Sequence, residues 1–449
     1  MRLLQSSRLI LKVVAALLLS CFLCAASFAF SDLSISGKVT DAQGKPLAHA
    51  TVMVYHAGVT TGYNLFCPSC YADCGKRATT DSKGMFTFKR LSPDLWFQLL
   101  VASNGYEPTF VDKIVPASNK LITATLMRRQ SVSDPSRVFR GRVVDSQGLA
   151  LRDAVVQPVG LLLDKKQRNS VYFFHAIAPG LDPMAITDED GGFEIAYSQP
   201  VGGNPMLPGG GRPLKILVSV DARGTAPAFA VISAGLERHR ITVTDGATVR
   251  GRLVQDGKPV GDAEVGLMAR GGGFDDDLNP VGNPYYDELR IGTQPDGSFV
   301  IPNVPTPENW YIYAKMESVA TRGATGNIEC ATKHDDELVG LGDLQIMPAY
   351  YLRGRVVLSD GKPIPDGMRV IINPEDARLN TQTAMLPADG HFEFVGLATG
   401  SYDLSASVKG YSPPPIPPLS VKGKDVDNLV ITLHPNVSRA AKTTPTPKT

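Results

Sequence analysis

The sequence predicts an all-β protein made of four tandem antiparallel β-sandwich domains. Three observations lead to this prediction. A strand of the form apolar-x-Gly-basic-apolar occurs four times, each copy is followed by a phrase in which Asp and Gly precede Phe, and convincing amphipathic helices are absent. The copies lie roughly a hundred residues apart, which is the size of a small domain, whereas solenoid repeats span about 20 to 50 residues. We therefore expect a string of similar, independent domains.

The first phrase of each repeat predicts a strand that runs into a tight turn and then a second strand. Its central glycine is Gly37, Gly141, Gly251 or Gly354. The turns that follow contain Gly44, Gly148, Gly257 and Gly361, and a proline stands after three of them at positions 46, 259 and 363. Glycine supplies the positive φ, and proline the fixed φ, that a tight hairpin needs.

The second phrase predicts another strand, turn and strand. It spans Thr80–Phe86, Thr187–Phe193, Thr293–Phe299 and Leu386–Phe392. Between the phrases, segments such as Ala50–Tyr55 alternate as half-buried strands do, with Val52 and Val54 on one face and Met53 on the other. Later strands at 96–101, 214–220, 310–315 and 402–408 close the repeats. With about seven short strands in each repeat, a two-sheet sandwich is the natural way to bury one face of each strand.

Domain boundaries are expected where the strand pattern lapses. The four domains are predicted at residues 33–127, 137–245, 247–348 and 350–434. The polar segment Met127–Ser136 has no periodicity and is interpreted as a linker, whereas the second and third domains follow each other so closely that little freedom is expected between them. Residues 436–449 are rich in Lys, Thr and Pro and are predicted to be a disordered tail.

The N-terminus has the order of a secretory signal peptide. Basic residues precede an apolar run that begins at Val13, and small residues end at Ala29. We expect cleavage near Ala29, so residues 1–29 would be a signal peptide and the protein would be secreted or held in the periplasm or cell envelope. The alternative is an uncleaved anchor, and this segment would then be the protein's contact with a membrane.

Composition and histidine spacing argue against several functions. Lysine and arginine number 45, aspartate and glutamate number 44, and the net charge is +1. Nucleic acid is therefore not expected as a partner, because its recognition needs a strongly basic face. The seven histidines stand singly, without the paired spacing of a metalloenzyme. The sequence predicts no catalytic residue and no cofactor.

A cysteine cluster, Cys67, Cys70 and Cys74, stands out in the first predicted domain. In an exported protein we expect disulfides, and with Cys330 these residues permit three pairings that the sequence cannot choose between. If Cys330 joined the cluster, the first and third domains would lie side by side. A metal site with His56 as a further ligand, or a redox-active pair, is the alternative.

Long insertions interrupt three of the predicted sandwiches. They span Tyr63–Lys76, Leu161–Pro183, Pro200–Arg212 and Gly271–Tyr286. Loops of a sandwich gather at its ends and commonly build binding surfaces, so the aromatic residues in these insertions are candidate ligand contacts. They are Tyr172, Phe173, Phe174, Tyr285 and Tyr286. The alternative is that these side chains hold each insertion against its own sandwich.

The paired phrases at residues 37–47 and 80–86 resemble those of carboxypeptidase regulatory-like domains, and Gly400–Tyr402 and Lys409–Tyr411 match the usual end of the same motif. The resemblance is strongest in the first and fourth repeats. It implies an Ig-like or transthyretin-like β-sandwich, related to carbohydrate-binding-like folds, that acts as a non-catalytic accessory module. We therefore expect a binding or scaffold protein whose partner is a cell-surface protein or, alternatively, a polysaccharide. A thiol or metal-binding protein is the third alternative.

Overall fold

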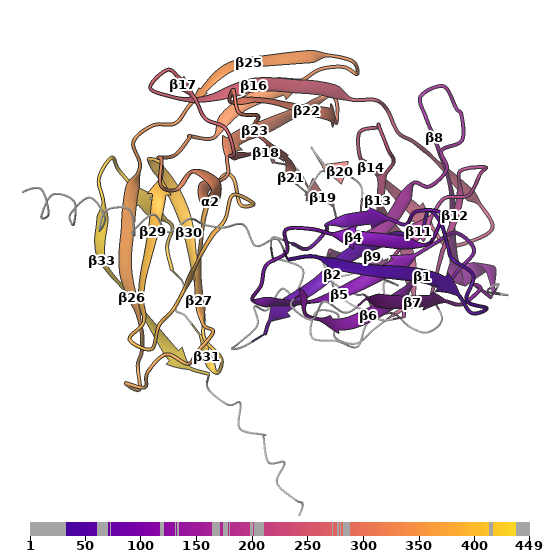
Figure 1. Cartoon of the computed structure of the whole chain (residues 1–449), viewed down its shortest axis with the longest axis horizontal. Coiled ribbons are helices and arrows are strands. Elements are labelled where there is room, and N and C mark those ends of the chain that lie inside the picture. The colour runs from indigo at the N-terminus through magenta and orange to yellow at the C-terminus, as the bar shows by residue number, and fades with distance from the viewer. Residues whose placement is uncertain are drawn as a thin grey trace, which may run out of the picture.

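A computed structural model gives the architecture of the chain (Figure 1). The structure describes residues 33–60, 71, 73–116, 121–130, 132, 134–163, 171–173, 178, 180–197, 201, 211–271, 273–275, 278, 280–281, 288–412 and 416–436. The described chain is all-β, as the sequence predicts: it consists of small, mainly antiparallel sheets and contains very little helix. The predicted signal peptide and C-terminal tail lie outside the described residues.

Two sheets enclose each of four hydrophobic cores. The first core lies between sheets β4-β1-β7 and β3-β2-β5-β6, formed by β1 Ile35–Asp41, β2 Thr51–Val59, β3 Arg77–Thr79, β4 Met85–Phe88, β5 Leu95–Ala102, β6 Thr109–Ile114 and β7 Ile122–Leu126. The second core lies between the sheets β12-β8-β15 and β10-β9-β13-β14, and β11 also pairs with β9. Their strands are β8 Val138–Val144, β9 Val155–Leu163, β10 Val171–Phe173, β11 Ala185–Ile186, β12 Gly192–Ala196, β13 Pro213–Asp221, β14 Ala228–Ser233 and β15 Arg238–Thr242.

The other two cores are built in the same way. The third core lies between two sheets, β17-β16-β22, in which β25 also pairs with β16, and β21-β18-β23-β24. Their strands are β16 Ala247–Gln255, β17 Lys258–Pro259, β18 Glu264–Ala269, β21 Glu288–Gly292, β22 Ser298–Val304, β23 Glu308–Ala314, β24 Ile328–Thr332 and β25 Leu338–Gln345. A separate two-stranded sheet is formed by β19 Gly273–Phe274 and β20 Pro280–Val281. The fourth lies between β29-β26-β33-β31 and β28-β27-β30-β32; the strands are β26 Tyr350–Leu358, β27 Arg369–Pro374, β28 Gln382–Met385, β29 His391–Leu397, β30 Gly400–Ser407, β31 Tyr411–Ser412, β32 Leu419–Val421 and β33 Val426–Pro435.

The four sandwiches share one topology. In each, the strand of the first phrase pairs antiparallel with the strand of the second phrase and parallel with the last strand of the repeat, as β1 does with β4 and β7. The same arrangement joins β8 to β12 and β15, β16 to β22 and β25, and β26 to β29 and β33. The repeat in the sequence is therefore a repeat of strand pairing. The domain boundaries themselves stay a prediction.

The glycine and the phenylalanine of the two phrases lie opposite each other in the sheet. Gly37 pairs with Phe86, Gly141 with Phe193, Gly251 with Phe299 and Gly354 with Phe392. A Cβ atom on any of these glycines would lie closer than 3.0 Å to the ring of its partner. The ring thus covers the bare backbone of the glycine, and this contact explains why the two phrases occur together.

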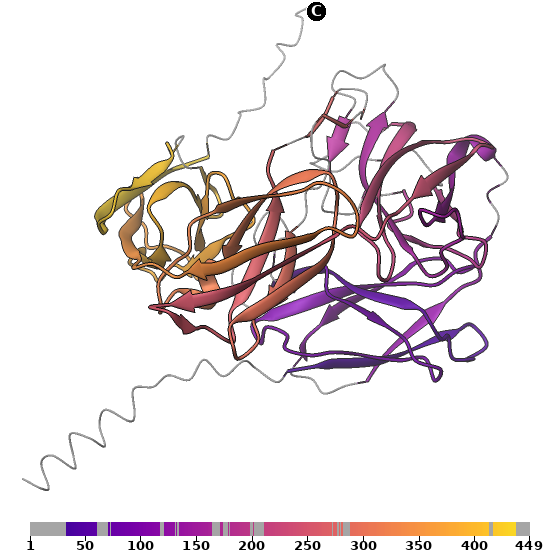
Figure 2. The ribbon, with the colours of Figure 1, turned by 90° about the horizontal axis from the view of Figure 1, so that it is seen from above.

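Apolar side chains pack between neighbouring sandwiches, which a string of independent domains would not require. The outer face of β2, with Met53 and Tyr55, packs against Met184 and Ile186 of the second repeat. Leu278 of the third repeat contacts Leu162 and Leu217 of the second. Figures 1 and 2 show the third sandwich between the fourth and the first two. The predicted linker is also held, since the guanidinium of Arg128 lies over the ring of Tyr106 and Arg129 forms an ion pair with Asp182.

Two short helical segments occur among the described residues of the connections. The 3-10 turn Pro135–Arg137 leads into β8, and its N-cap Asp134 accepts a hydrogen bond from the backbone N–H of Ser136. The four-residue helix α2, Met316–Val319, follows β23. No helix in the described part of the chain is both long and apolar enough to cross a membrane.

Candidate functional site

The candidate site lies where the third and fourth sandwiches meet. Helix α2 leaves the end of β23 and places Met316 in the hydrophobic core of the fourth sandwich, beside residues such as Leu404. The backbone N–H of Met316 donates to Oδ1 of Asn380 across the junction, over 2.9 Å. Gly396 approaches α2 so closely that a Cβ atom there would lie 2.6 Å from Cα of Ala320. The two sandwiches therefore share one interlocked boundary.

A buried ion pair holds the same junction from the third sandwich. Nζ of Lys315 donates to the two carboxylate oxygens of Glu288 over 3.0 and 3.1 Å, and it also donates to the backbone carbonyl of Leu379 over 2.5 Å. The hydroxyl of Tyr313 and the guanidinium of Arg290 donate to the same carboxylate. Burial lowers the pKa of Lys315 below the usual lysine value, and the neighbouring Glu288 opposes that shift.

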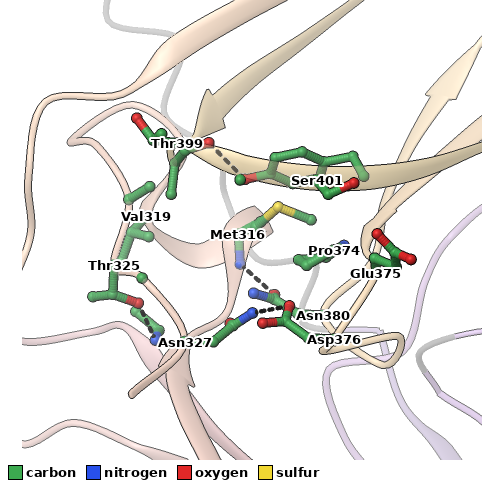
Figure 3. Close-up of a pocket in the computed structure, with 16 residues that line it drawn as sticks. Met316, Val319, Thr325, Asn327, Pro374, Glu375, Asp376, Asn380, Thr399 and Ser401 are labelled. Atoms are coloured by element: carbon green, nitrogen blue, oxygen red, sulfur yellow. Dashed lines mark hydrogen bonds between the residues drawn. The ribbon is translucent and has the colours of Figure 1, made fainter. Parts of the chain in front are cut away.

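A cavity of about 550 Å³ opens beside these contacts (Figure 3). Its apolar surface comes from residues such as Met316, Val319 and Pro374, and its polar surface comes from Thr325, Asn327, Glu375, Asp376, Asn380, Thr399 and Ser401. Its walls are fixed by hydrogen bonds. Thr325 Oγ1 accepts from the backbone N–H of Ala314 over 2.8 Å, and Nδ2 of Asn327 donates to Asp376 over 2.6 Å. The cavity is therefore a preformed polar hollow with two carboxylates at one side.

Two of the predicted cysteines lie in the described part of the chain, and they lie in different sandwiches. Cys74 packs against the first core, whereas Cys330 on β24 packs against the third. Burial raises the pKa of Cys74 to about 12 and that of Cys330 to about 11. A raised thiol pKa opposes thiolate chemistry at neutral pH. Cys67 and Cys70 lie outside the described residues, so the predicted disulfides stay a prediction.

His56, the further ligand considered for a metal, lies on β2 next to Tyr55 with ring centroids 4.7 Å apart. Its Nε2 is buried and has no hydrogen-bond partner among the described residues, and burial lowers the pKa of the ring. Within the described ranges, no three His, Cys, Asp or Glu side chains gather as a metal site would require. The metal alternative therefore rests on cysteines beyond those ranges.

The aromatic candidates fall in or beside segments outside the described residues. Tyr172 and Phe173 belong to β10, which pairs antiparallel with β9. Phe174, Tyr285 and Tyr286 are not among the residues described. Their role as ligand contacts stays a prediction.

None of the residues that line the junction cavity was among the candidate sites predicted from the sequence. The cavity is assembled from a short helix after β23, the segment after β27 and the start of β30, which lie far apart in the sequence. Asn380 and Asp376 stand in a polar connection that carries no motif. One sequence feature could have pointed to the junction: the ionisable residues Glu288 and Lys315 lie in or next to strands that were expected to be apolar.

The fold and this junction define a tandem β-sandwich protein in which neighbouring sandwiches are interlocked. Two regions, residues 34–126 and 351–434, match the carboxypeptidase regulatory-like domain. The matched regions are the first and fourth repeats, the two in which the phrases resemble that family most fully. A comparison with curated proteins finds no match.

The comparison with solved structures matches a Bacillus anthracis protein and several pilins. The Bacillus anthracis TIE protein shares 10% identity, with 89% of this chain and 73% of that chain covered and a TM-score of 0.18. GBS52, the minor pilin of Streptococcus agalactiae, shares 15% identity over 45% of this chain and 98% of its own, with a TM-score of 0.22. A streptococcal ancillary pilin shares 14% identity over 67% of this chain and 100% of its own, with a TM-score of 0.21. Likenesses this distant transfer no function.

Proposed function

We propose that this chain is an exported, non-catalytic scaffold that binds a surface partner protein through the loop insertions of its β-sandwiches. The observation that carries the proposal is that the joints between the sandwiches are filled with side chains. Met316 enters the fourth core, and Met53 and Tyr55 contact Met184. Fixed joints hold the sandwiches that carry these loops in one arrangement, which lowers the ordering cost of binding. The accessory, regulatory-like character of the matched domains supports a role without catalysis.

Two insertions of the second sandwich are suited to a test because their ends are closed by described backbone contacts. Val201 and Gly211 exchange two backbone hydrogen bonds of 2.8 Å, so residues 202–210 can be replaced by a short Gly-Ser turn. Val171 on β10 is the antiparallel partner of Leu162 on β9, so residues 164–170 can be shortened separately. Each variant should keep the thermal stability of the intact chain, because the buried framework is left in place.

The experiment is cross-linking on intact cells with the intact chain and the two shortened variants. We expect the intact chain to cross-link to one surface protein, and we expect this cross-link to be lost when at least one loop is shortened, while both variants are exported and folded. Equal cross-linking by all three chains would contradict a role for these loops.

N-terminal sequencing of the exported protein tests the signal peptide. We expect the mature chain to start near residue 30.

The thiol or metal alternative finds less support. Burial holds the pKa values of Cys74 and Cys330 above the usual range, whereas redox-active and metal-binding cysteines need an accessible thiolate. Zinc analysis of the purified protein decides this alternative, because a site made of Cys67, Cys70 and Cys74 would retain the metal with fixed stoichiometry.

A further inference from the structure

We propose that the cavity between the third and fourth sandwiches binds a neutral polyhydroxylated ligand, such as the terminal residues of a saccharide chain. This binding site is independent of the scaffold role, because that role depends on other loops and is tested by a different experiment. The cavity volume of about 550 Å³ lies within the range of about 300–1,000 Å³ that is typical of small-molecule sites. Because both sandwiches supply its walls, the site exists only when the junction is closed.

Asn380 offers the cavity an amide donor. Asn380 is 3% exposed and lines the cavity. Its Oδ1 accepts from the backbone N–H of Met316, while its Nδ2 donates to no described residue. The amide nitrogen carries two N–H donors. A ligand oxygen in the cavity would satisfy this donor.

Acceptors and hydroxyls surround the same space. Figure 3 shows Asp376 and Glu375 on the side of Asn380 and Pro374, with Thr399 and Ser401 from the start of β30 across the view. Glu375 and Asp376 are exposed, and neither forms an ion pair with a described lysine or arginine. Hydroxyl side chains can both donate and accept, whereas carboxylates only accept. The cavity therefore offers donors and acceptors together.

This mixture selects the ligand chemistry. A sugar hydroxyl both donates and accepts, so neighbouring hydroxyls can satisfy the amide of Asn380 and the carboxylate of Asp376 at once. An ammonium or guanidinium group has only donors and could not pair with Asn380 Nδ2. An anion would be repelled by the two carboxylates. The apolar groups of Met316, Val319 and Pro374 match the C–H surface of a sugar ring.

The test uses the full mature chain and saturation-transfer NMR with a panel of cello-, xylo-, manno- and chito-oligosaccharides, followed by calorimetry on the best binder. Thr399→Trp should fill the cavity and abolish binding, because Thr399 is an exposed lining residue with no role in the junction contacts. The matched control is Thr125→Trp, at an exposed position on β7 of the first sandwich, which should bind like the unmodified chain. Melting curves confirm that both variants are folded.

A second variant tests the contribution of the Asn380 amide to binding. Asn380→Asp keeps the oxygen that accepts from Met316 and replaces the donor with an acceptor, so saccharide affinity should fall by about tenfold, the usual worth of one hydrogen bond. A basic peptide, tested in parallel, would bind more tightly to Asn380→Asp if the cavity were a cation site. That result, the absence of saccharide binding to the unmodified chain, or binding untouched by Thr399→Trp would each overturn the proposal.

Discussion

At the scale of single residues, the repeat is defined by a glycine that a phenylalanine covers. The backbone of Gly251 lies under the ring of Phe299, and there is no room for a methyl group between them. The glycine of the second phrase is equally constrained. Gly297 has a φ of +76°, and its carbonyl accepts from the backbone N–H of Leu253 over 2.8 Å. Each phrase thus contributes one position that only glycine fits.

The first prediction concerns this covered glycine. Gly251→Ala should lower the free energy of unfolding of the third sandwich by about 1–3 kcal/mol, because the added methyl group must displace the Phe299 ring. Gly340→Ala on β25 of the same sandwich is the control, since a Cβ atom there has open space. Urea denaturation of the two variants measures the difference. Equal free energies of unfolding would show that the Phe299 ring moves aside without loss of stability.

The second prediction concerns Cys330 and pH. A thiol whose pKa is raised to about 11 is ionised in only about one molecule in a thousand at pH 8. Alkylation of Cys330, followed by mass spectrometry of its peptide, should therefore be about a hundredfold slower in the folded than in the denatured protein. The rate should rise about tenfold for each unit of pH between 7 and 9. A fast reaction at neutral pH would contradict the inferred burial.

The glycines, turns and strands could be predicted at this scale because each has a local signature. The buried threonines could not. Thr80 Oγ1 donates to the carbonyl of Leu47 over 2.7 Å and accepts from the N–H of Ala50 over 2.9 Å, and Thr187 repeats both contacts in the second sandwich. Thr293 accepts from the N–H of Ala263 in the same way, but it donates to the carbonyl of Ala263 itself. In the fourth repeat Leu386 stands at this position, where it is buried as an apolar residue. The sequence shows the threonine but not the distant backbone groups that it satisfies.

At the scale of elements, helix α2 determines how the third sandwich meets the fourth. It has only four residues, too few to produce a helical periodicity in the sequence, and its importance comes from the place of Met316 in a core that belongs to another repeat. The outer face of β2 presents a similar case. The alternation of Ala50–Tyr55 predicts one buried face, yet Met53 and Tyr55 on the other face are also buried, against the second sandwich.

The third prediction follows from the position of Met316. Met316→Ala should cost about 2–5 kcal/mol, because it leaves a cavity in the fourth core and removes the side chain that joins the two sandwiches. Met385→Ala is the control, because Met385 lies on the same sandwich and is 54% exposed. Its cost should stay within about 0.5 kcal/mol. Calorimetry should show the Met316 variant melting in separated transitions, and a single unshifted transition would contradict the interlock.

At the scale of the whole molecule, the first and fourth sandwiches touch although the two regions are far apart in the chain. The guanidinium of Arg369 on β27 lies 5.4 Å from the ring centre of Tyr71, which belongs to the cysteine-containing insertion. Tyr71 itself is buried with the first core. The fold class could be predicted from the repeat, but this closure could not, because it depends on one contact between side chains of the first and fourth sandwiches that the repeat pattern does not bring together.

The fourth prediction tests this closure. Arg369→Gln removes the cation that lies over the Tyr71 ring, a contact worth about 0.5–2 kcal/mol. The radius of gyration from small-angle scattering should increase, while the melting temperature of the fourth sandwich should hardly change. Arg378→Gln, at an exposed position of the same sandwich, should leave the radius unchanged. Equal radii for both variants would show that other contacts keep the chain closed.

The placement of Met316 in a neighbouring core also limits how this protein can be taken apart and reused. A domain that has its own complete hydrophobic core can in principle fold alone. Here the third sandwich would carry an uncovered methionine into any new setting, and the fourth would be left with an unfilled hollow. The smallest portable piece at this end of the molecule is therefore the pair, residues 247–434, and lineages that reshuffle such domains should inherit the two together.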